Sequence, residues 1–276
     1  MNPASNTRRI TPHFLPKIWG SSRLGPWFEP RGEELTGEVW FPAGELLIKF
    51  LFTSDNLSVQ VHPDEEYALL HENSHGKNEM WHILRADPGA QIALGFKRQY
   101  STDQVIAAAK SGEIMHQLNW FEVSAGQTWF IPAGTVHAIG AGLALCEIQQ
   151  NSDVTYRLFD YGRDRELHLR QAADVLIPGP YCEASQPSED HDGLRFLAGC
   201  RWFQTYSAVV NRPQVIPQNG DSWRGARFLV VLEGQGSVNS LRAEPGQVFD
   251  AGELHPWKVE PDPSTGSGSM KLLLVG

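Results

Sequence analysis

The residues from Leu57 to Asp64 limit the fold and the chemistry of this chain more than any other stretch. Apolar and polar side chains alternate in the sequence Leu-Ser-Val-Gln-Val-His-Pro-Asp, which is typical of a β-strand. Successive side chains of a strand point to opposite faces, so Ser58, Gln60 and His62 share one face and the two valines share the other. A glutamine and a histidine on one face of a strand that ends at a proline indicate half of a metal site.

Composition indicates a mostly β protein. The chain has 276 residues, enough for one large or two small domains, and 41% of them are hydrophobic. Its 26 glycines and 18 prolines separate many short apolar runs. Short strands at regular spacing with glycine and proline turns favour barrels or a sandwich.

Charge and cysteine content exclude several classes of function. The formal net charge is −9 and the longest basic run is Arg8-Arg9, which argues against nucleic-acid and anionic-membrane partners. A small anionic substrate would need only a local cluster of lysine and arginine. Three cysteines without a Cys-x-x-Cys spacing indicate a reducing compartment. We find no signal peptide and no apolar run of membrane-spanning length, so we expect a cytoplasmic protein.

A second motif supplies the missing half of the metal site. Residues 126–137 read Gly, five residues, Pro132, one residue, Gly134, two residues, His137, which fits the second cupin motif in full. The first cupin motif normally has His-x-His and a glutamate soon afterwards. Here Gln60 replaces the first histidine, and Glu79 follows His62 only after seventeen residues. A Gln–His–Glu–His set with such an insertion resembles the type I phosphomannose isomerases, which are zinc cupins.

The resemblance extends over roughly residues 12–176. Further segments that look like signature segments of the family are 57–64, 76–81, 131–140 and 147–163. The chain is similar to the short bacterial form, which lacks the extra helical domain of the larger enzymes. The resemblance implies a mainly β fold of two cupin barrels (double-stranded β-helices, or jelly rolls) with a few short helices. The second barrel is expected to be degenerate.

Domain limits follow from the composition of the middle of the chain. Residues 178–194 are rich in proline and acidic side chains and are the best candidate for a boundary. We therefore expect a catalytic, metal-binding cupin with a helical insertion at 1–180 and a cupin-like barrel without metal at 181–276. In the second half the glycine turns persist, but His255 falls two positions short of the place of a metal histidine.

The resemblance implies one Zn²⁺ per chain, held by Gln60, His62, Glu79 and His137. The donor types support this independently, because two imidazoles, a carboxylate and a neutral oxygen suit Zn²⁺ and leave positions open for water or substrate. Burying Glu79 beside Trp81 without a cation would be costly.

The implied reaction is the interconversion of mannose 6-phosphate and fructose 6-phosphate through a cis-enediol, which belongs to carbohydrate and mannose metabolism. The resemblance makes Arg157 a catalytic or phosphate-contacting residue, and a guanidinium fork suits phosphate. The alternative is a structural salt bridge from Arg157 to Asp160 or Glu147. The general base stays open among Lys77, Glu147 and a metal-bound water.

Three further residues are predicted to contact the substrate. Ser58 shares the face of the candidate ligands, and Glu147 opens a signature segment. Lys49 interrupts the apolar run Leu46–Phe52, so it either reaches out to solvent or faces a polar cavity, and we favour the cavity.

Two rival functions remain at this point. An iron cupin dioxygenase normally has a His-rich ligand set with a close glutamate, and Gln60 and Glu79 argue against it. A sugar-phosphate sensor without turnover would keep the same site. The sequence leaves the oligomeric state, the breadth of aldose substrates and the physiological direction open.

Overall fold

The computed structural model describes residues 6–182, 190–191, 193–216, 226–252, 256–265 and 268–276. They form 22 strands and four helices. The helices are α1 (Glu65–His71), α2 (Thr102–Ser111), α3 (Ile114–Gln117) and α4 (Leu169–Val175). The strands of the first half are β1 (Arg8–Arg9), β2 (His13–Ser21), β3 (Thr36–Ala43), β4 (Leu46–Phe52), β5 (Val59–Val61), β6 (Glu79–Ala86), β7 (Gln91–Phe96), β8 (Leu118–Glu122), β9 (Thr128–Ile131), β10 (His137–Ile139), β11 (Leu143–Gln150) and β12 (Tyr156–Phe159). Those of the second half are β13 (Asp190–His191), β14 (Leu194–Gly199), β15 (Gln204–Val210), β16 (Gln214–Ile216), β17 (Phe228–Glu233), β18 (Gly236–Val238), β19 (Leu241–Ala243), β20 (Val248–Asp250), β21 (Trp257–Pro261) and β22 (Met270–Val275).

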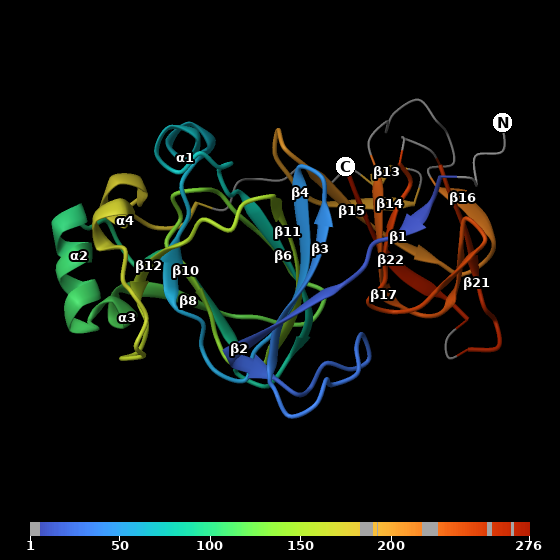
Figure 1. The fold of residues 1–276 in the computed structure, drawn as a ribbon, viewed down its shortest axis with the longest axis horizontal. Helices are drawn as coiled ribbons and strands as arrows, with labels where there is room; N and C mark the ends of the chain where they lie inside the picture. The colour runs from blue at the N-terminus through green and yellow to red at the C-terminus, as the bar shows by residue number, and fades with distance from the viewer. Residues whose placement is uncertain (1–5, 183–189, 192, 217–225, 253–255, 266–267) are drawn as a thin grey trace.

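The strands form four sheets, and the expected mainly β fold with a few short helices is confirmed. In the first half, a six-stranded sheet has the order β2-β3-β4-β11-β6-β9 and a five-stranded sheet the order β12-β5-β10-β7-β8. A seven-stranded sheet joins β1 to strands of the second half in the order β1-β20-β17-β22-β15-β14-β13, and a four-stranded sheet of the second half has the order β16-β21-β18-β19. Figure 1 shows the two halves side by side, with the helices on the side of the first half that lies away from the second.

Strand β4 of the six-stranded sheet is buried on both faces. All seven residues of β4 are buried. Ile48 and Phe50 belong to an apolar cluster with Val230 and Leu273 of the seven-stranded sheet. Because alternate residues point the other way, Lys49 faces the interior of the first half and lines a cavity there. A lysine in an apolar run therefore marks the strand's cavity-facing side.

The five-stranded sheet uses the same alternation to separate helices from the site. Val59 and Val61 of β5 pack in an apolar cluster with Val105 of α2 and Ala172 of α4. The opposite face of β5 carries Gln60 into the first half of the molecule. The strand expected from the alternating pattern is present, although its hydrogen-bonded part is short.

Local capping explains where α1 and α2 begin and where α2 ends. Asp64 accepts a hydrogen bond from the Tyr67 amide at the start of α1. Ser101 and Gln104 form a capping box at the start of α2, which ends at Gly112 in a left-handed conformation. Within the described residues, no helix is long and apolar enough to cross a membrane.

The second half is joined to the first by more than one contact. Strand β1, from the N-terminal end of the chain, pairs with β20. Asp250 on β20 is buried and accepts hydrogen bonds from Arg8 and Arg227. The domain boundary at residue 180 stays a prediction. Part of the 178–194 segment lies outside the described residues, and so does His255.

The shared apolar layer generates a stability prediction. Val230 is fully buried between the two halves, whereas Val209, on the same sheet, is 65% exposed. We expect Val230→Ala to lower the free energy of unfolding by about 2 to 3 kcal/mol, since two methyl groups leave a packed core. Val209→Ala is the matched control and should change it by less than about 0.5 kcal/mol. Denaturant or thermal unfolding measures both, and equal shifts for the two variants would contradict the layered core.

Candidate metal centre and its cavity

Three potential metal ligands from distant parts of the chain meet in the first half. His62 follows β5, Glu79 opens β6 and His137 opens β10. One ligand atom from each lies within 4.8 Å of the others, and all three residues are buried. The Glu79 carboxylate lies 3.6 Å from His62 Nε2 through one oxygen and 3.4 Å from His137 Nε2 through the other. The two imidazoles come from the five-stranded sheet and the carboxylate from the six-stranded sheet.

Backbone carbonyls orient both imidazoles. His62 Nδ1 donates to the Val154 carbonyl at 2.9 Å, and His137 Nδ1 donates to the Thr135 carbonyl at 2.8 Å. With the proton on Nδ1, each Nε2 presents a lone pair toward Glu79. His62 Nε2 and both Glu79 oxygens are buried without a hydrogen-bond partner among the described residues. Electron-pair donors left unsatisfied in this way fit a bound cation.

The electrostatics of the cluster agree with this interpretation. Burial lowers the pKa of His137 to about 4. Burial, and then the nearby Lys77, lowers the pKa of His62 as well. Both imidazoles are therefore neutral at pH 7, the form that binds metals. Burial and then the negative charge of Glu147 raise the pKa of Glu79 to about 8, which shows that this carboxylate lacks a sufficient counter-charge within the protein.

Gln60 lies beside the cluster. It pairs across the sheet with His137, and its Nε2 amide donates to His137 Nε2 at 3.2 Å. A 180° rotation of the amide places Oε1 where Nε2 lies, and the two orientations are distinguished only by hydrogen-bond partners. The structure thus brings all four predicted ligands together, and a ligand role for Gln60 stays a prediction.

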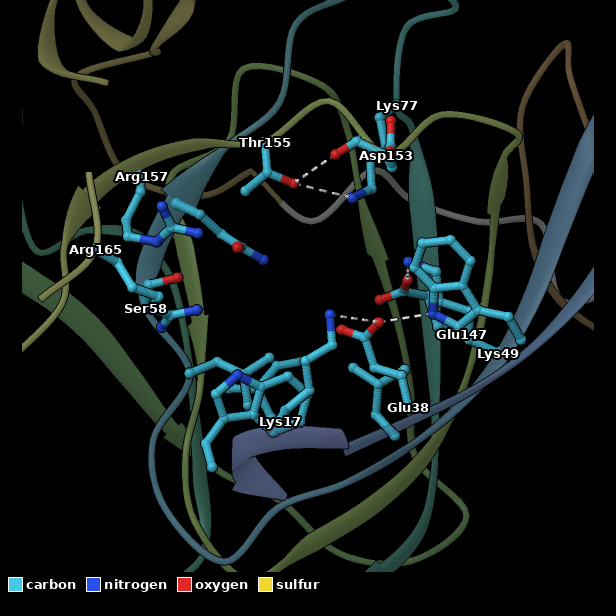
Figure 2. Close-up of a pocket in the computed structure, with 16 residues that line it drawn as sticks. Lys17, Glu38, Lys49, Ser58, Lys77, Glu147, Asp153, Thr155, Arg157 and Arg165 are labelled. Carbon is cyan, nitrogen blue, oxygen red and sulfur yellow. Dashed lines mark hydrogen bonds and ion pairs between the residues drawn. The ribbon is translucent and has the colours of Figure 1, made fainter. Parts of the chain in front are cut away.

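A cavity of about 240 Å³ lies next to the cluster. Charged side chains from both sheets line it, as Figure 2 shows. On β4, β11 and β6, Lys49, Glu147 and Trp81 are direct cross-strand neighbours on one face. Lys49 Nζ donates to Glu147 at 2.9 Å and also to Gln149, and the Trp81 indole donates to the other Glu147 oxygen at 2.9 Å.

Lys49 and Glu147 form a buried ion pair. Burial alone would raise the pKa of Glu147, but Lys49 and Lys77 outweigh it and the pKa is lowered. Burial alone would lower the pKa of Lys49, but Glu147 and Glu38 outweigh it and the pKa is raised. Lys77 differs, because burial and the charge of Lys49 lower its pKa. Among the described residues, the Lys77 ammonium has one hydrogen bond, a long one of 3.4 Å to the Thr155 hydroxyl.

Arg157 is held by the backbone and not by the carboxylates considered from sequence. Its Nη1 donates to the Glu166 carbonyl at 2.8 Å. Asp160 is instead paired with Arg163 and Arg165, and Glu147 with Lys49. Arg157 and the predicted substrate contact Ser58 both line the cavity.

Several cavity residues were missed from the sequence, among them Lys17, Glu38, Trp40 and Arg165. Glu38 accepts a hydrogen bond from the Trp40 indole at 2.6 Å and forms an ion pair with Lys17 at 3.3 Å. Arg165 reaches the cavity from the loop after β12. Glu38 and Trp40 are alternate residues of one strand, so the sequence could have predicted that they share a face. That this face meets Lys49 depends on strand pairing, which the sequence does not show.

A hydrogen-bond network supports the motif that carries His137. Asn78, next to Glu79, accepts from the Ala133 amide at 3.1 Å and donates to Gln150 at 2.8 Å. Gln150 in turn donates to Glu65 at 2.8 Å. The network ties the turn before β10 to β6, so it fixes the relative position of two of the candidate ligands.

The fold and the site together define a class, that of two-barrel cupins with a buried candidate metal centre beside a charged cavity. No protein-family model matches the chain. Mannose-6-phosphate isomerase of Streptococcus mutans serotype c is 38% identical over an alignment of 217 residues, which covers 74% of this chain and 66% of that protein. Mannose-6-phosphate isomerase ManA of Bacillus subtilis is 42% identical over an alignment of 209 residues, which covers 60% of this chain and 66% of that protein.

A further B. subtilis relative, YvyI, is 30% identical over 82% of this chain and 85% of its own length. The chain belongs to the mannose-6-phosphate isomerase family. The matched regions span just under two thirds of the first two relatives. In structure, the B. subtilis mannose 6-phosphate isomerase matches with a TM-score of 0.83, at 23% identity over 99% of this chain and 100% of that chain. A zinc-bound mannose 6-phosphate isomerase matches with a TM-score of 0.72 at 12% identity, over 98% of this chain and 99% of that chain. Both likenesses concern the fold.

The raised pKa of Glu79 predicts a pH dependence for the metal-free protein. Between pH 4.5 and about 8 the folded state holds a proton that the unfolded state has released, so the free energy of unfolding falls as pH rises. The histidines with lowered pKa values oppose this only below their ordinary value of 6.5. Between pH 6.5 and 8, we expect the free energy of unfolding of the chelator-treated protein to fall by about 1 to 2 kcal/mol more than that of its Glu79→Gln variant. Denaturant unfolding across this range is the measurement, and parallel curves for the two proteins would contradict the prediction.

Proposed function

We propose that the protein is a zinc-dependent aldose–ketose isomerase that interconverts mannose 6-phosphate and fructose 6-phosphate. The observation that carries the proposal is the buried His62–Glu79–His137 group, in which His62 Nε2 and both Glu79 oxygens lack hydrogen-bond partners among the described residues. It lies beside a charged cavity in a chain of the mannose-6-phosphate isomerase family.

His62, Glu79 and His137 would hold the metal, with Gln60 as the fourth ligand through its side-chain oxygen. When bound, zinc would supply a Lewis acid that stabilises negative charge on the oxygens of the open-chain sugar. The remaining chemistry comes from side chains of the cavity, which bind the sugar phosphate and move its protons.

Substrate binding falls to the cationic side chains of the cavity and to Ser58. Arg157 has donors that no carboxylate among the described residues occupies, so it can contact an anionic substrate or the negative charge of an enediolate. Lys49 is committed to Glu147 and Gln149, and we assign Lys49 and Glu147 to shaping the site and hydrogen-bonding sugar hydroxyls.

Proton transfer between C2 and C1 of the sugar requires a group that can give up and take back a proton near the cluster. Glu147 has both oxygens engaged, one with Lys49 and one with Trp81. Lys77 lines the cavity and has only the distant Thr155 hydroxyl as a side-chain partner among the described residues. Of the two candidate side chains, we therefore propose Lys77 and not Glu147 as the residue that moves the proton.

The proposal also covers the cellular location, the partners and the domains of the enzyme. All three cysteines are free, which supports a reducing, cytoplasmic location. The acidic net charge of −9 supports a small-molecule substrate without nucleic-acid or membrane partners. We also propose that residues 1–180 form the catalytic domain and 181–276 a barrel without metal.

His62→Ala should lose metal and activity together, because one of three buried donors is removed. Metal analysis and a coupled isomerase assay on mannose 6-phosphate measure the two effects, with the unmodified protein as the reference.

The same two measurements on the unmodified protein distinguish the rival functions. Zinc together with turnover is the expected result. Zinc with mannose 6-phosphate binding but no turnover would favour the sensor, and iron with oxygen uptake would favour a dioxygenase.

Arg157→Ala should keep zinc and lose turnover. The guanidinium contacts no metal ligand among the described hydrogen bonds, so metal content should equal that of the unmodified protein. Loss of a donor to developing negative charge should lower kcat/KM by about 10² to 10³. An unchanged kcat/KM would show that Arg157 contacts neither the substrate nor the enediolate.

A further inference from the structure

Residues 63–78 connect two of the candidate metal ligands, His62 and Glu79, and contain Lys77. They form α1, at the top of the first half in Figure 1, and a turn that leads into β6. Lys77 lies in the turn, before β6 begins, so its backbone belongs to no strand. Figure 2 shows its side chain at the cavity, where Thr155 offers only a long hydrogen bond to the ammonium. The position of Lys77 therefore depends on what holds the backbone of the turn.

Glu65, in the first turn of α1, holds the turn on the N-terminal side of Lys77. One carboxylate oxygen accepts from the Gly76 amide at 2.8 Å, and the other lies 2.9 Å from His75 Nδ1. Partial burial alone would raise the pKa of Glu65, but the hydrogen bonds from His75 and Gly76 outweigh it and the pKa is lowered. The carboxylate is therefore ionised at neutral pH, and its hydrogen bonds are charge-assisted.

The same carboxylate holds the C-terminal side of Lys77 through Gln150. Gln150 Nε2 donates to Glu65 at 2.8 Å. Gln150 Oε1 accepts from the backbone amide of Asn78 at 3.0 Å and from its side-chain amide at 2.8 Å. Gln150 is 2% exposed and belongs to β11, so this link is fixed by the six-stranded sheet. The amides before and after Lys77 are thus both connected to Glu65.

The turn also packs closely against the start of α1. A Cβ atom at Gly76 would lie 2.4 Å from the backbone nitrogen of Glu65 and 2.5 Å from the carbonyl carbon of Asp64. Only glycine allows this approach, because both obstacles are backbone atoms. The Lys77 amide donates to the Pro63 carbonyl at 3.0 Å. The turn therefore follows any movement of the residues around Glu65.

Helix α1 is itself fixed to the rest of the first half. The Tyr156 hydroxyl on β12 donates to Glu72, at the C-terminal end of α1, at 2.6 Å. The Tyr67 hydroxyl donates to Asp174 of α4 at 3.0 Å. Glu65 therefore acts from a helix with its own contacts to a strand and to a second helix.

We propose that Glu65 is a positioning residue, which keeps the Lys77 side chain in the cavity by fixing the backbone on both sides of it. The inference rests on the proposed function, in which Lys77 moves the proton. It does not extend to Glu79, because that residue is held in the sheet between Gln149 of β11 and Ile131 of β9. Loss of the Glu65 carboxylate should therefore displace Lys77 and leave the metal ligands in place.

Glu66 offers a matched control. It carries the same charge in the same turn of α1, is exposed, and makes no side-chain hydrogen bond or ion pair with a described residue. Glu65→Ala and Glu66→Ala thus remove the same charge, and only the first removes contacts with the turn. Glu65→Gln is the rescue variant. Its amide oxygen can accept from Gly76 and Gln150, as one carboxylate oxygen does now, and its amide nitrogen can donate to Nδ1 of a neutral His75.

The test combines amide hydrogen exchange with steady-state kinetics on mannose 6-phosphate, both on the zinc-loaded protein. We expect Glu65→Ala to speed exchange of the Gly76 and Asn78 amides by about tenfold or more. Its kcat should fall by about 10- to 100-fold, since a displacement of about 1 Å has effects of that size, while KM and zinc content stay within about twofold. Glu66→Ala and Glu65→Gln should keep kcat within about threefold of the unmodified protein.

Glu65→Asp replaces Glu65→Ala if the latter does not fold. It keeps the charge but is shorter by one methylene, so it cannot reach Gly76 and Gln150 together, and its kcat should lie between those of Glu65→Ala and the unmodified protein. Unchanged exchange at Gly76 and Asn78, an equal loss of kcat in Glu66→Ala, loss of zinc together with kcat, or no rescue by Glu65→Gln would each overturn the assignment.

The exchange measurement separates this inference from the proposed function. An unmodified protein that does not convert mannose 6-phosphate would contradict the proposed function. Faster exchange at Gly76 and Asn78 in Glu65→Ala, but not in Glu66→Ala, would then still show that Glu65 holds the turn around Lys77, and equal exchange in the two variants would show that it does not.

Discussion

A buried carboxylate between two neutral imidazoles is the constraint on which the rest of this structure depends. Glu79 is 1% exposed, and neither of its oxygens has a hydrogen-bond partner among the described residues. Keeping such a group out of water is unfavourable unless a cation compensates it. The free energy that holds it in place comes from the apolar layers around it, and the lone pairs of His62 and His137 are aimed at the same point by backbone carbonyls. The fold and these carbonyls therefore determine where the three donor groups lie.

The six-stranded sheet connects this site to the second half of the molecule. One face of β4 presents Lys49 to the cavity, and the other presents Phe50 to the seven-stranded sheet. A shift of the strand by one residue would exchange these faces, placing a lysine in the apolar layer and a phenylalanine in the site. The apolar contact with the second half thus fixes the register that points Lys49 into the cavity. The second half therefore supports the cavity through packing.

The distribution of charge in the cavity separates two tasks. Acids and lysines on the six-stranded sheet are paired with one another, which leaves an ionised but locally balanced wall. The arginines near β12 are paired with a backbone carbonyl or with one buried carboxylate and keep unused donors. A substrate with one anionic end and one reactive carbonyl end fits this asymmetry, because each end meets a different kind of wall.

Patterns within single segments were sufficient to predict much of the protein. Alternation placed Gln60 and His62 on one face of a strand, and the motif ending at His137 supplied the second histidine. These features depend on neighbours in the sequence, so they could be read without a structure. The places of Glu38 and Arg165 in the cavity, and the bond from Lys49 to Glu147 across 98 residues, could not. They depend on which strands pair and in which register, and those are decided by the packing of whole sheets.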